Sequence, residues 1–197
     1  QSDHAFEQDL ALIVEADQIT TVKVFGFQQD HDLVVLQDNG NCVSSDDKRS
    51  ACISSCEILA SKAIESGAKL AYYVRPPYGY EAFGRSPVEQ CRAFDELFTD
   101  IASKNGAVCV YVNRAFEYAI ENTDIRLWGD DNAHTSDEGA YLAVCVHFAT
   151  IFGKSATLLD ENGIENAKVL QEVADKIVLE DNVWTKPNRF IKNTREL

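Results

Sequence analysis

Short apolar runs alternate with stretches of helical periodicity along this chain, and this alternation is the feature that most restricts its fold. The clearest runs span residues 32–37, 69–74 and 107–112. Apart from Asp32, Gln37 and Lys69 at their ends they are continuously apolar, which is typical of strands buried on both faces. Strands separated by helices are joined by right-handed crossovers in a parallel sheet. The sequence therefore predicts an α/β sandwich, in which helices cover both faces of a mostly parallel sheet.

Helical periodicity fills the intervals between and after these runs. The segments predicted to be helical are 6–15, 46–67, 87–105, 115–120, 137–152 and 163–178, and a further strand is expected at 21–25. Ser86 and Ser136 are candidate N-caps, and Gly67 and Gly106 are expected to end their helices. We find no internal repeat and no linker. Residues 1–180 are therefore predicted to form one domain, followed by a polar tail over 181–197.

The composition restricts the partners of this chain. Of its 197 residues 45% are hydrophobic, enough for a sizeable core, and its formal net charge is −14. Nucleic-acid binding needs clustered Lys and Arg, so this charge argues against it. No apolar run approaches the roughly 18 residues that would span a bilayer, so we expect no membrane insertion. A neutral or cationic small substrate, or a polysaccharide, is compatible with the charge, and the oligomeric state stays open.

Two further observations concern processing and cofactors. The chain contains no methionine and begins at Gln1, so we expect it to be a processed or trimmed product. The acidic pairs at 46–47 and 130–131 are accompanied by no second histidine and no patterned loop of oxygen ligands. The sequence therefore predicts neither a metal site nor another cofactor.

The six cysteines match no zinc or redox motif in their spacing. They are Cys42, Cys52, Cys56, Cys91, Cys109 and Cys145. Cys52 and Cys56 are four residues apart, as on one helix face, whereas Cys109 and Cys145 lie in apolar segments and are expected to be buried. The sequence is compatible with one or two disulfides among the first four cysteines and does not decide whether they form. The compartment, whether cytoplasmic, periplasmic or extracellular, stays open with them.

A polar loop ahead of the helix at 137–152 holds an aspartate three residues before a histidine, Asp131 and His134. This spacing lets the carboxylate and the imidazole come from one turn. The aspartate can then fix the tautomer and orientation of a general-base histidine, as in an acyl-transfer triad. Short motifs of this kind are common. In the alternative interpretation Asp131 braces the loop, and His134 is a polar residue near a helix start.

Polar residues also follow the strand predicted at 32–37. Active sites in open parallel sheets lie at the carboxyl ends of the strands, where 37–42, 75–80 and the loop with Asp131 and His134 are all expected. A carboxamide at a strand end can donate a hydrogen bond to an oxyanion. Asn41 is a candidate for that role, or else a turn residue beside Gly40. Gln37 either contacts the substrate or satisfies backbone groups at the strand end.

Aromatic residues and an arginine are candidates for substrate binding. The tyrosines are Tyr72, Tyr73, Tyr78 and Tyr80, and at least one of them is expected in the core because the first two alternate along a strand. The four tyrosines are candidates for lining a sugar-binding cleft, with Arg75 holding a polar group, and Tyr78 is the one assigned to substrate binding. Trp128 either forms a wall of this pocket or packs beneath it.

Together these motifs resemble the SGNH (GDSL-like) hydrolase superfamily of esterases and lipases, in particular an uncharacterised bacterial branch. The last block of the family, Asp-x-x-His, is matched by Asp131 and His134. Its third block, an Asn that follows a buried strand, is matched by Asn41. In the carbohydrate-esterase branch that block reads Gln-Gly-Glu-Ser-Asn, which agrees with Gln37 and Asn41 at its two ends. The resemblance covers residues 32–178 and implies a flavodoxin-like three-layer α/β/α sandwich.

The chain departs from the family at its N-terminus. The family places a nucleophilic serine in a tight turn after its first strand, but we predict no strand before Ser2, the only serine ahead of the first predicted helix. Gly26 is the nearest candidate for the glycine that carries the second oxyanion donor. The resemblance implies that Ser2 is the nucleophile, that His134 is the base and that Asp131 orients it.

The sequence thus predicts a serine esterase that hydrolyses a small, acetyl-type ester, with an acetylated carbohydrate as the first candidate. The alternative is a binding or structural module of the same fold that lacks a functional nucleophile. A third expectation is a truncated piece of an active esterase. In each case the partner is a small-molecule or saccharide ligand.

Overall fold

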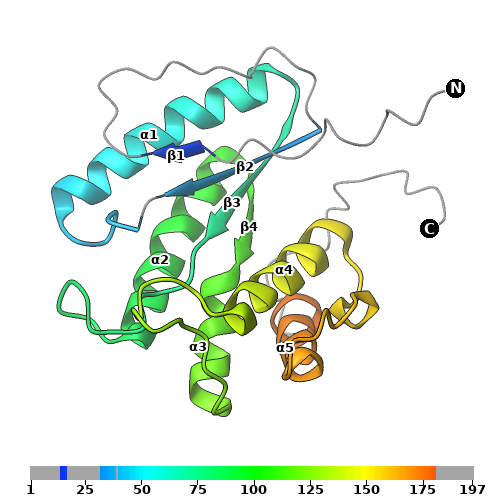
Figure 1. The fold of residues 1–197 in the computed structure, drawn as a ribbon. Helices are drawn as coiled ribbons and strands as arrows, with labels where there is room; N and C mark the ends of the chain where they lie inside the picture. The colour runs from blue at the N-terminus through cyan, green and yellow to red at the C-terminus, as the bar shows by residue number, and fades with distance from the viewer. Residues whose placement is uncertain (1–13, 17–31, 39, 181–197) are drawn as a thin grey trace, which may run out of the picture. The chain divides into compact units, whose positions relative to one another are not determined.

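The strands form one sheet. The structure is a computed structural model that describes residues 32–38 and 40–180, together with the backbone of 14–16. The strands β1 (Val14–Ala16), β2 (Leu33–Asp38), β3 (Lys69–Val74) and β4 (Val108–Tyr111) follow one another in the order β1-β2-β3-β4 (Figure 1). β2 pairs in parallel with both β1 and β3. The chain is therefore an α/β protein with a parallel sheet, as the sequence predicts.

The chain divides into two compact units. The first unit comprises Gln1–Tyr73 and Asp100–Cys109, and the second comprises Val74–Thr99 and Val110–Leu197. The prediction of a single domain over 1–180 stays a prediction. The predicted tail at 181–197 lies outside the described residues. The two units are considered separately below.

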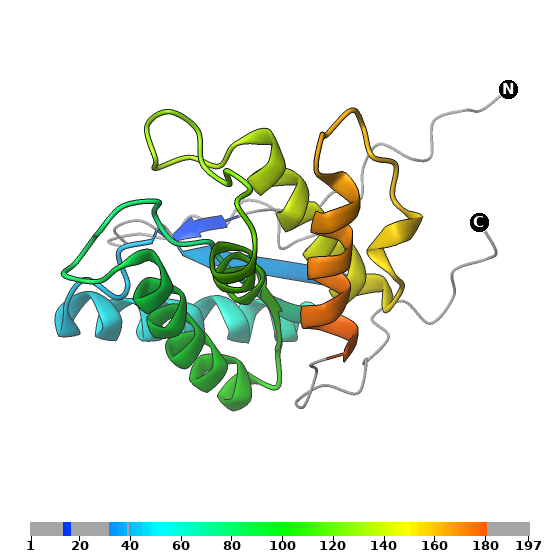
Figure 2. The same cartoon turned by 90° about the horizontal axis from the view of Figure 1, so that it is seen from below.

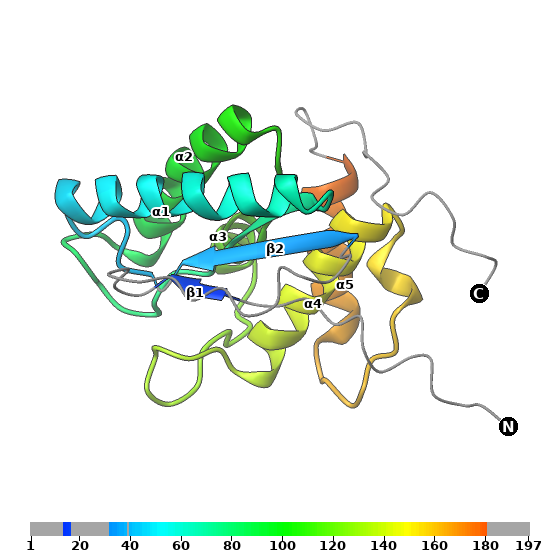
Figure 3. The same ribbon diagram turned by 90° about the horizontal axis from the view of Figure 1, so that it is seen from above.

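In the first unit, helix α1 (Asp46–Glu65) runs alongside β2 (Figure 3). Ser45 caps the helix by accepting a hydrogen bond from the Lys48 N–H at 3.3 Å, and two aspartates in the first turn suit the helix dipole. Gly67 follows the helix with φ +84°, a conformation that favours glycine. The buried face of α1 consists of small and medium side chains that allow close approach to the sheet: Cys56, Leu59, Ala60 and Ala63.

Helix α2 (Pro87–Asn105) has the bounds that the sequence predicts. Ser86 and Glu89 form a capping box, in which Glu89 Oε2 accepts from the Ser86 N–H at 2.8 Å and Ser86 Oγ accepts from the Glu89 N–H at 3.4 Å. The helix ends before Gly106, which has φ +64°. The part of α2 in the second unit buries Phe94, Leu97 and Phe98 completely.

The second unit is mainly helical. It holds α3 (Val112–Asn122), α4 (Asp137–Phe152), the 3₁₀ turn η1 (Ala156–Leu158), α5 (Ala167–Asp175) and the π-helical turn η2 (Lys176–Glu180). α4 and α5 lie side by side (Figure 2). Ser136 caps α4 by accepting from the Gly139 N–H at 3.1 Å, as predicted. A Cβ at Gly139 would lie 2.1 Å from the Leu127 carbonyl oxygen, so only glycine fits at this position.

Several predicted bounds are wrong. Val14 and Glu15 were predicted to be helical but lie in β1, because strand pairing with Leu36 and Gln37 overrides the local periodicity. The rest of the helix predicted at 6–15 and the strand predicted at 21–25 lie outside the described residues. The strand predicted at 107–112 is shorter, since Val112 already begins α3. The last predicted helix begins at Ala167, because Gly163 has φ +76° and belongs to a turn.

The cysteines and tyrosines agree with what the sequence predicts. All six cysteines are free thiols, and Cys109 and Cys145 are buried. Of the four tyrosines, Tyr72 is fully buried and accepts a hydrogen bond from Asn105 Nδ2 at 3.1 Å. Among the described helices, none combines the length and the apolar character needed to cross a membrane.

Candidate active site

The loop that contains Asp131 and His134 connects α3 to α4 and is closed by backbone hydrogen bonds. Trp128 and Thr135 form a bridge at its base, and the Gly129 N–H donates to the His134 carbonyl at 2.9 Å. Asn132 lies at the tip with φ +53°, a region that asparagine tolerates better than most residues. The loop is therefore a defined turn.

Asp131 and His134 are hydrogen bonded to each other, with 2.6 Å between Asp131 Oδ2 and His134 Nδ1. The other carboxylate oxygen, Oδ1, accepts from the backbone N–H groups of Ala133 at 2.9 Å and His134 at 3.0 Å. These bonds, first of all the one from the His134 ring, hold the pKa of Asp131 well below its usual range. An ionised Asp131 accepts the proton of Nδ1, which leaves Nε2 of His134 as the basic nitrogen.

The basic nitrogen of His134 is open to solvent. The His134 side chain is 88% exposed and that of Asp131 is 52% exposed. Within the part of the chain that the structure describes, no group forms a hydrogen bond with Nε2 of His134. The pair thus presents an oriented imidazole that is free to take a proton from a group placed beside it.

A second loop, residues 75–85, is hydrogen bonded to the loop that contains Asp131 and His134. The Gly79 N–H donates to the Asn132 carbonyl at 2.8 Å, and Trp128 Nε1 donates to the Pro77 carbonyl at 3.0 Å. A Cβ at Gly79 would lie 2.8 Å from the Trp128 ring, so the absence of a side chain allows the close contact. These contacts place the predicted binding residues of the 75–85 loop next to the loop that holds the pair.

The side chain of Gln90 fixes the shape of the 75–85 loop through hydrogen bonds to its backbone. This side chain is fully buried; Oε1 accepts from the Tyr78 N–H at 3.0 Å, and Nε2 donates to the carbonyls of Tyr80 and Arg85 at 2.8 and 3.1 Å. Sequence reasoning missed Gln90. The available signal was its position four residues before the buried Phe94 on a predicted helix, since a polar residue on a buried face needs internal partners.

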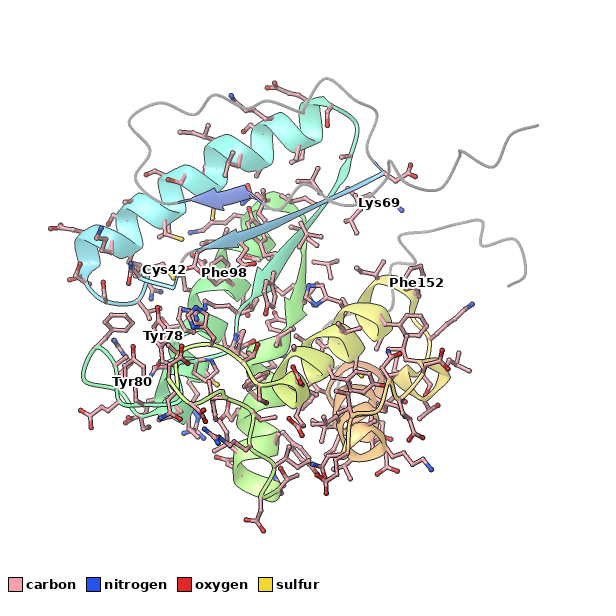
Figure 4. All side chains as sticks on the ribbon, viewed as in Figure 1. Cys42, Lys69, Tyr78, Tyr80, Phe98 and Phe152 are labelled. Atoms are coloured by element: carbon pink, nitrogen blue, oxygen red, sulfur yellow. The ribbon has the colours of Figure 1, made fainter. Side chains whose placement is uncertain are left out.

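Tyr78 and Tyr80 lie on the 75–85 loop (Figure 4), and the guanidinium of Arg75 and the ring of Phe83 lie beside Tyr78. The rings of Tyr78 and Tyr80 stack with centroids 5.3 Å apart, and Phe83 meets Tyr78 edge-on at 6.1 Å. The Arg75 guanidinium lies 4.5 Å from the centre of the Tyr78 ring. Nη1 of Arg75 is buried and has no hydrogen-bond partner among the described residues. Arg75 therefore retains donor capacity beside an aromatic surface.

The ring contact of Trp128 agrees with packing, one of the two roles that the sequence left open, and its contact with a substrate stays a prediction. Its ring meets that of Phe116 edge-on, with centroids 5.6 Å apart, and this contact is packing. Phe116 is fully buried, while Trp128 is half-buried at the base of the loop with the pair. Trp128 thus supports this loop and keeps part of its ring accessible.

The remaining predicted residues belong to other parts of the chain. Gln37 is half-buried in β2, and Asn41 lies in a turn in which its carbonyl accepts from the Ser44 N–H at 2.9 Å. Both are in the first unit, whereas the pair is in the second. Ser2 and Gly26 lie outside the described residues. The structure therefore brings Arg75, Tyr78 and Trp128 to the loops around the pair and leaves the nucleophile and the oxyanion donors as predictions.

No cluster of three or more His, Cys, Asp or Glu side chains that would suit a metal ion occurs among the described residues. No protein-family model, curated protein or solved structure matches this chain. The resemblance to SGNH hydrolases therefore rests on the motifs of the sequence.

Proposed function

We propose that this protein is a serine esterase of the SGNH type, with the three-layer α/β/α architecture of that superfamily, and that it hydrolyses a small acyl ester. The observation that carries the proposal is the hydrogen bond of 2.6 Å between Asp131 Oδ2 and His134 Nδ1. It leaves the opposite ring nitrogen basic and exposed. This is the arrangement that a general base of an acyl-transfer triad requires.

In the proposed mechanism Ser2 Oγ attacks the ester carbonyl while His134 Nε2 takes its proton. The negative charge of Asp131 stabilises the imidazolium that forms. Asn41 and a backbone N–H near Ser2 or at Gly26 hold the oxyanion of the tetrahedral intermediate. His134 then returns the proton to the leaving alcohol, and water removes the acyl group from Ser2 by the same route.

The loop beside the pair supports an acetylated carbohydrate as the first candidate substrate. The stacked rings of Tyr78 and Tyr80 offer an apolar face against which a sugar ring packs, and Arg75 keeps a free donor for a hydroxyl or carbonyl oxygen. Gln37 and Trp128 are the other residues proposed to contact the substrate. The net charge of −14 favours a neutral substrate over an anionic one.

Hydrolysis of p-nitrophenyl acetate by the full chain tests this proposal. We expect His134→Ala to lower kcat/KM by about 10,000-fold, and added imidazole to restore part of the rate by replacing the missing base. An unchanged rate in His134→Ala would contradict the proposal. Ser2→Ala is measured separately, because a rate that survives this change removes Ser2 from the mechanism and leaves the role of His134 intact.

One observation favours a second candidate, a binding or structural module of this fold without catalysis. The His134 side chain is 88% exposed, and no hydroxyl group of the described residues forms a hydrogen bond with its Nε2. A binding module predicts that an acetylated oligosaccharide binds to wild type and to His134→Ala with equal affinity and is recovered unchanged. Release of acetate by the wild-type protein excludes this candidate.

A further inference from the structure

Three thiols gather where β2 leads into α1. Cys42 lies in the turn that precedes the helix (Figure 4), while Cys52 and Cys56 are on α1 itself. The Cys52 and Cys56 sulfurs are 4.0 Å apart, and the thiol of Cys42 also interacts with that of Cys52. Cys52 is thus the central member of a thiol cluster formed by Cys42, Cys52 and Cys56.

The three thiols differ in access. Cys42 is 4% exposed and Cys56 is 7% exposed, whereas Cys52 is partly exposed on the helix surface. A reagent in solution therefore meets Cys52 first. The two buried thiols can be reached only through Cys52 or after a local opening of the chain.

Hydrogen bonds within the thiol cluster shift the pKa of Cys52 in the opposite direction to the pKa values of Cys42 and Cys56. Donation from Cys42 and from Cys56 lowers the pKa of Cys52 to about 4, and the positive charge of Arg49 acts in the same direction. The same hydrogen bonds, together with burial, raise the pKa of Cys42 and of Cys56. The lowered pKa favours the thiolate form of Cys52, which is the reactive form of cysteine.

We propose that the thiol cluster is a site of reversible oxidation, at which a low-molecular-weight disulfide converts Cys52 and Cys42 into a protein disulfide. The Cys52 thiolate attacks one sulfur of glutathione disulfide, and the first glutathione leaves as a thiolate. Cys42 then loses its proton and attacks the Cys52 sulfur of the mixed disulfide, which releases the second glutathione thiolate. Two protein thiols are oxidised and one glutathione disulfide is reduced to two glutathione molecules.

The geometry favours Cys42 over Cys56 as the partner of Cys52. Residues four apart on a helix are separated by about 6 Å along its axis, which a disulfide can span, but their side chains are parallel, so a Cys52–Cys56 bond would distort the helix. Cys42 is in a turn, which can move toward the helix. Formation of the mixed disulfide also disrupts the hydrogen bond between Cys42 and Cys52, which is the largest cause of the raised pKa of Cys42. The second step is thereby promoted by the first.

The site is tested by alkylation and mass spectrometry of the full chain. Reduced native protein is exposed briefly to iodoacetamide at pH 7, and modification is mapped by peptide. An ordinary thiol is only about 3% thiolate at this pH, so we expect Cys52 to react at least about 10-fold faster than the buried Cys91 and Cys145, which serve as internal controls. Its rate should stay constant from pH 8 down to about pH 6. Reaction no faster than that of the controls would overturn the proposal.

Glutathione disulfide then identifies the partner of Cys52. Wild type is expected to end with a Cys42–Cys52 disulfide, whereas Cys42→Ser and Cys42→Ala retain a glutathione on Cys52. Cys56→Ser is the matched variant and should still form the disulfide. Two results would contradict the proposal: a Cys52–Cys56 disulfide formed at the wild-type rate in both Cys42 variants, or no oxidation of wild type at any ratio of oxidised to reduced glutathione.

Discussion

The Asp131–His134 pair and the thiol cluster both hold an anion by hydrogen bonds, but they do so in opposite surroundings. The Asp131 carboxylate accepts one ring and two backbone donors in a loop that is largely exposed. The hydrogen bonds of Cys52 with Cys42 and Cys56, two residues that are almost completely buried, lower the pKa of Cys52. The first arrangement leaves a basic nitrogen open to a substrate. The second buries Cys42 and Cys56 and leaves Cys52 partly exposed.

This difference shows that solvent exposure influences which reactions a hydrogen-bonded group can take part in. An exposed and oriented imidazole can exchange protons with a substrate and with water, which acid–base catalysis requires. A half-buried thiolate with a neighbouring thiol is suited to exchange of sulfur bonds. Substitutions of Asp131, Gly139 and Gln90 should disturb the first arrangement and the residues that support its loop, with effects that decrease in this order.

Removing the charge of Asp131 should affect catalysis most. Asp131→Asn keeps the size of the side chain but no longer fixes the tautomer of His134, so we expect kcat/KM for p-nitrophenyl acetate to fall by about 1,000-fold or more. Asp130→Asn is the matched control, because Asp130 is fully exposed and its one ion pair among the described residues is with Arg126, at 2.9 Å. Equal rates in the two variants would show that the pair does not act as a catalytic unit.

A methyl group at Gly139 should be the most damaging change to the framework behind the loop. Its Cβ would lie 2.1 Å from the Leu127 carbonyl oxygen, so the first turn of α4 must shift. We expect Gly139→Ala to lower the free energy of unfolding by about 3 kcal/mol. Gly67→Ala is the control in urea denaturation. It meets no atom within 4 Å and bears only the strain of φ +84°, about 1 kcal/mol.

Gln90→Ala should loosen the 75–85 loop. The change leaves three backbone groups without their hydrogen bonds, at Tyr78, Tyr80 and Arg85. We expect a loss of about 2 kcal/mol in thermal or urea denaturation and faster amide exchange over the loop. Lys104→Ala, which removes one exposed ion pair with Asp100 on the same helix, should cost less than about 0.5 kcal/mol. Exchange over the loop that matches wild type would contradict the role given to Gln90.

The smallest effect concerns pH. The pKa of Asp131 is lowered in the folded chain, so its hydrogen bonds contribute stability above about pH 4, the ordinary pKa of aspartate. This contribution is lost as the pH falls through the lowered pKa. The stability difference between wild type and Asp131→Asn should therefore shrink on acidification, as measured by urea denaturation between pH 7 and pH 3. A difference that grows toward acid pH would contradict this sign.

The sequence predicts best what depends on neighbouring residues. The bounds of β3 and α2, and the hydrogen bond between Asp131 and His134, follow from short-range spacing and capping. Contacts between distant positions were not predicted. Gln90 bonds backbone groups of Tyr78 and Tyr80, 12 and 10 residues earlier in the chain, and Cys42 interacts with Cys52 on the following helix. The strand at Val14–Ala16 was missed because its partner is β2, far along the chain.

Mapping the serine that reacts with a fluorophosphonate tests the central claim most directly. The full wild-type chain is treated with the reagent, digested and sequenced by mass spectrometry in parallel with His134→Ala. The proposed triad predicts a single adduct, on Ser2, that disappears in His134→Ala. No adduct in wild type, or equal labelling of the two proteins, would contradict the claim that Asp131 and His134 activate a serine.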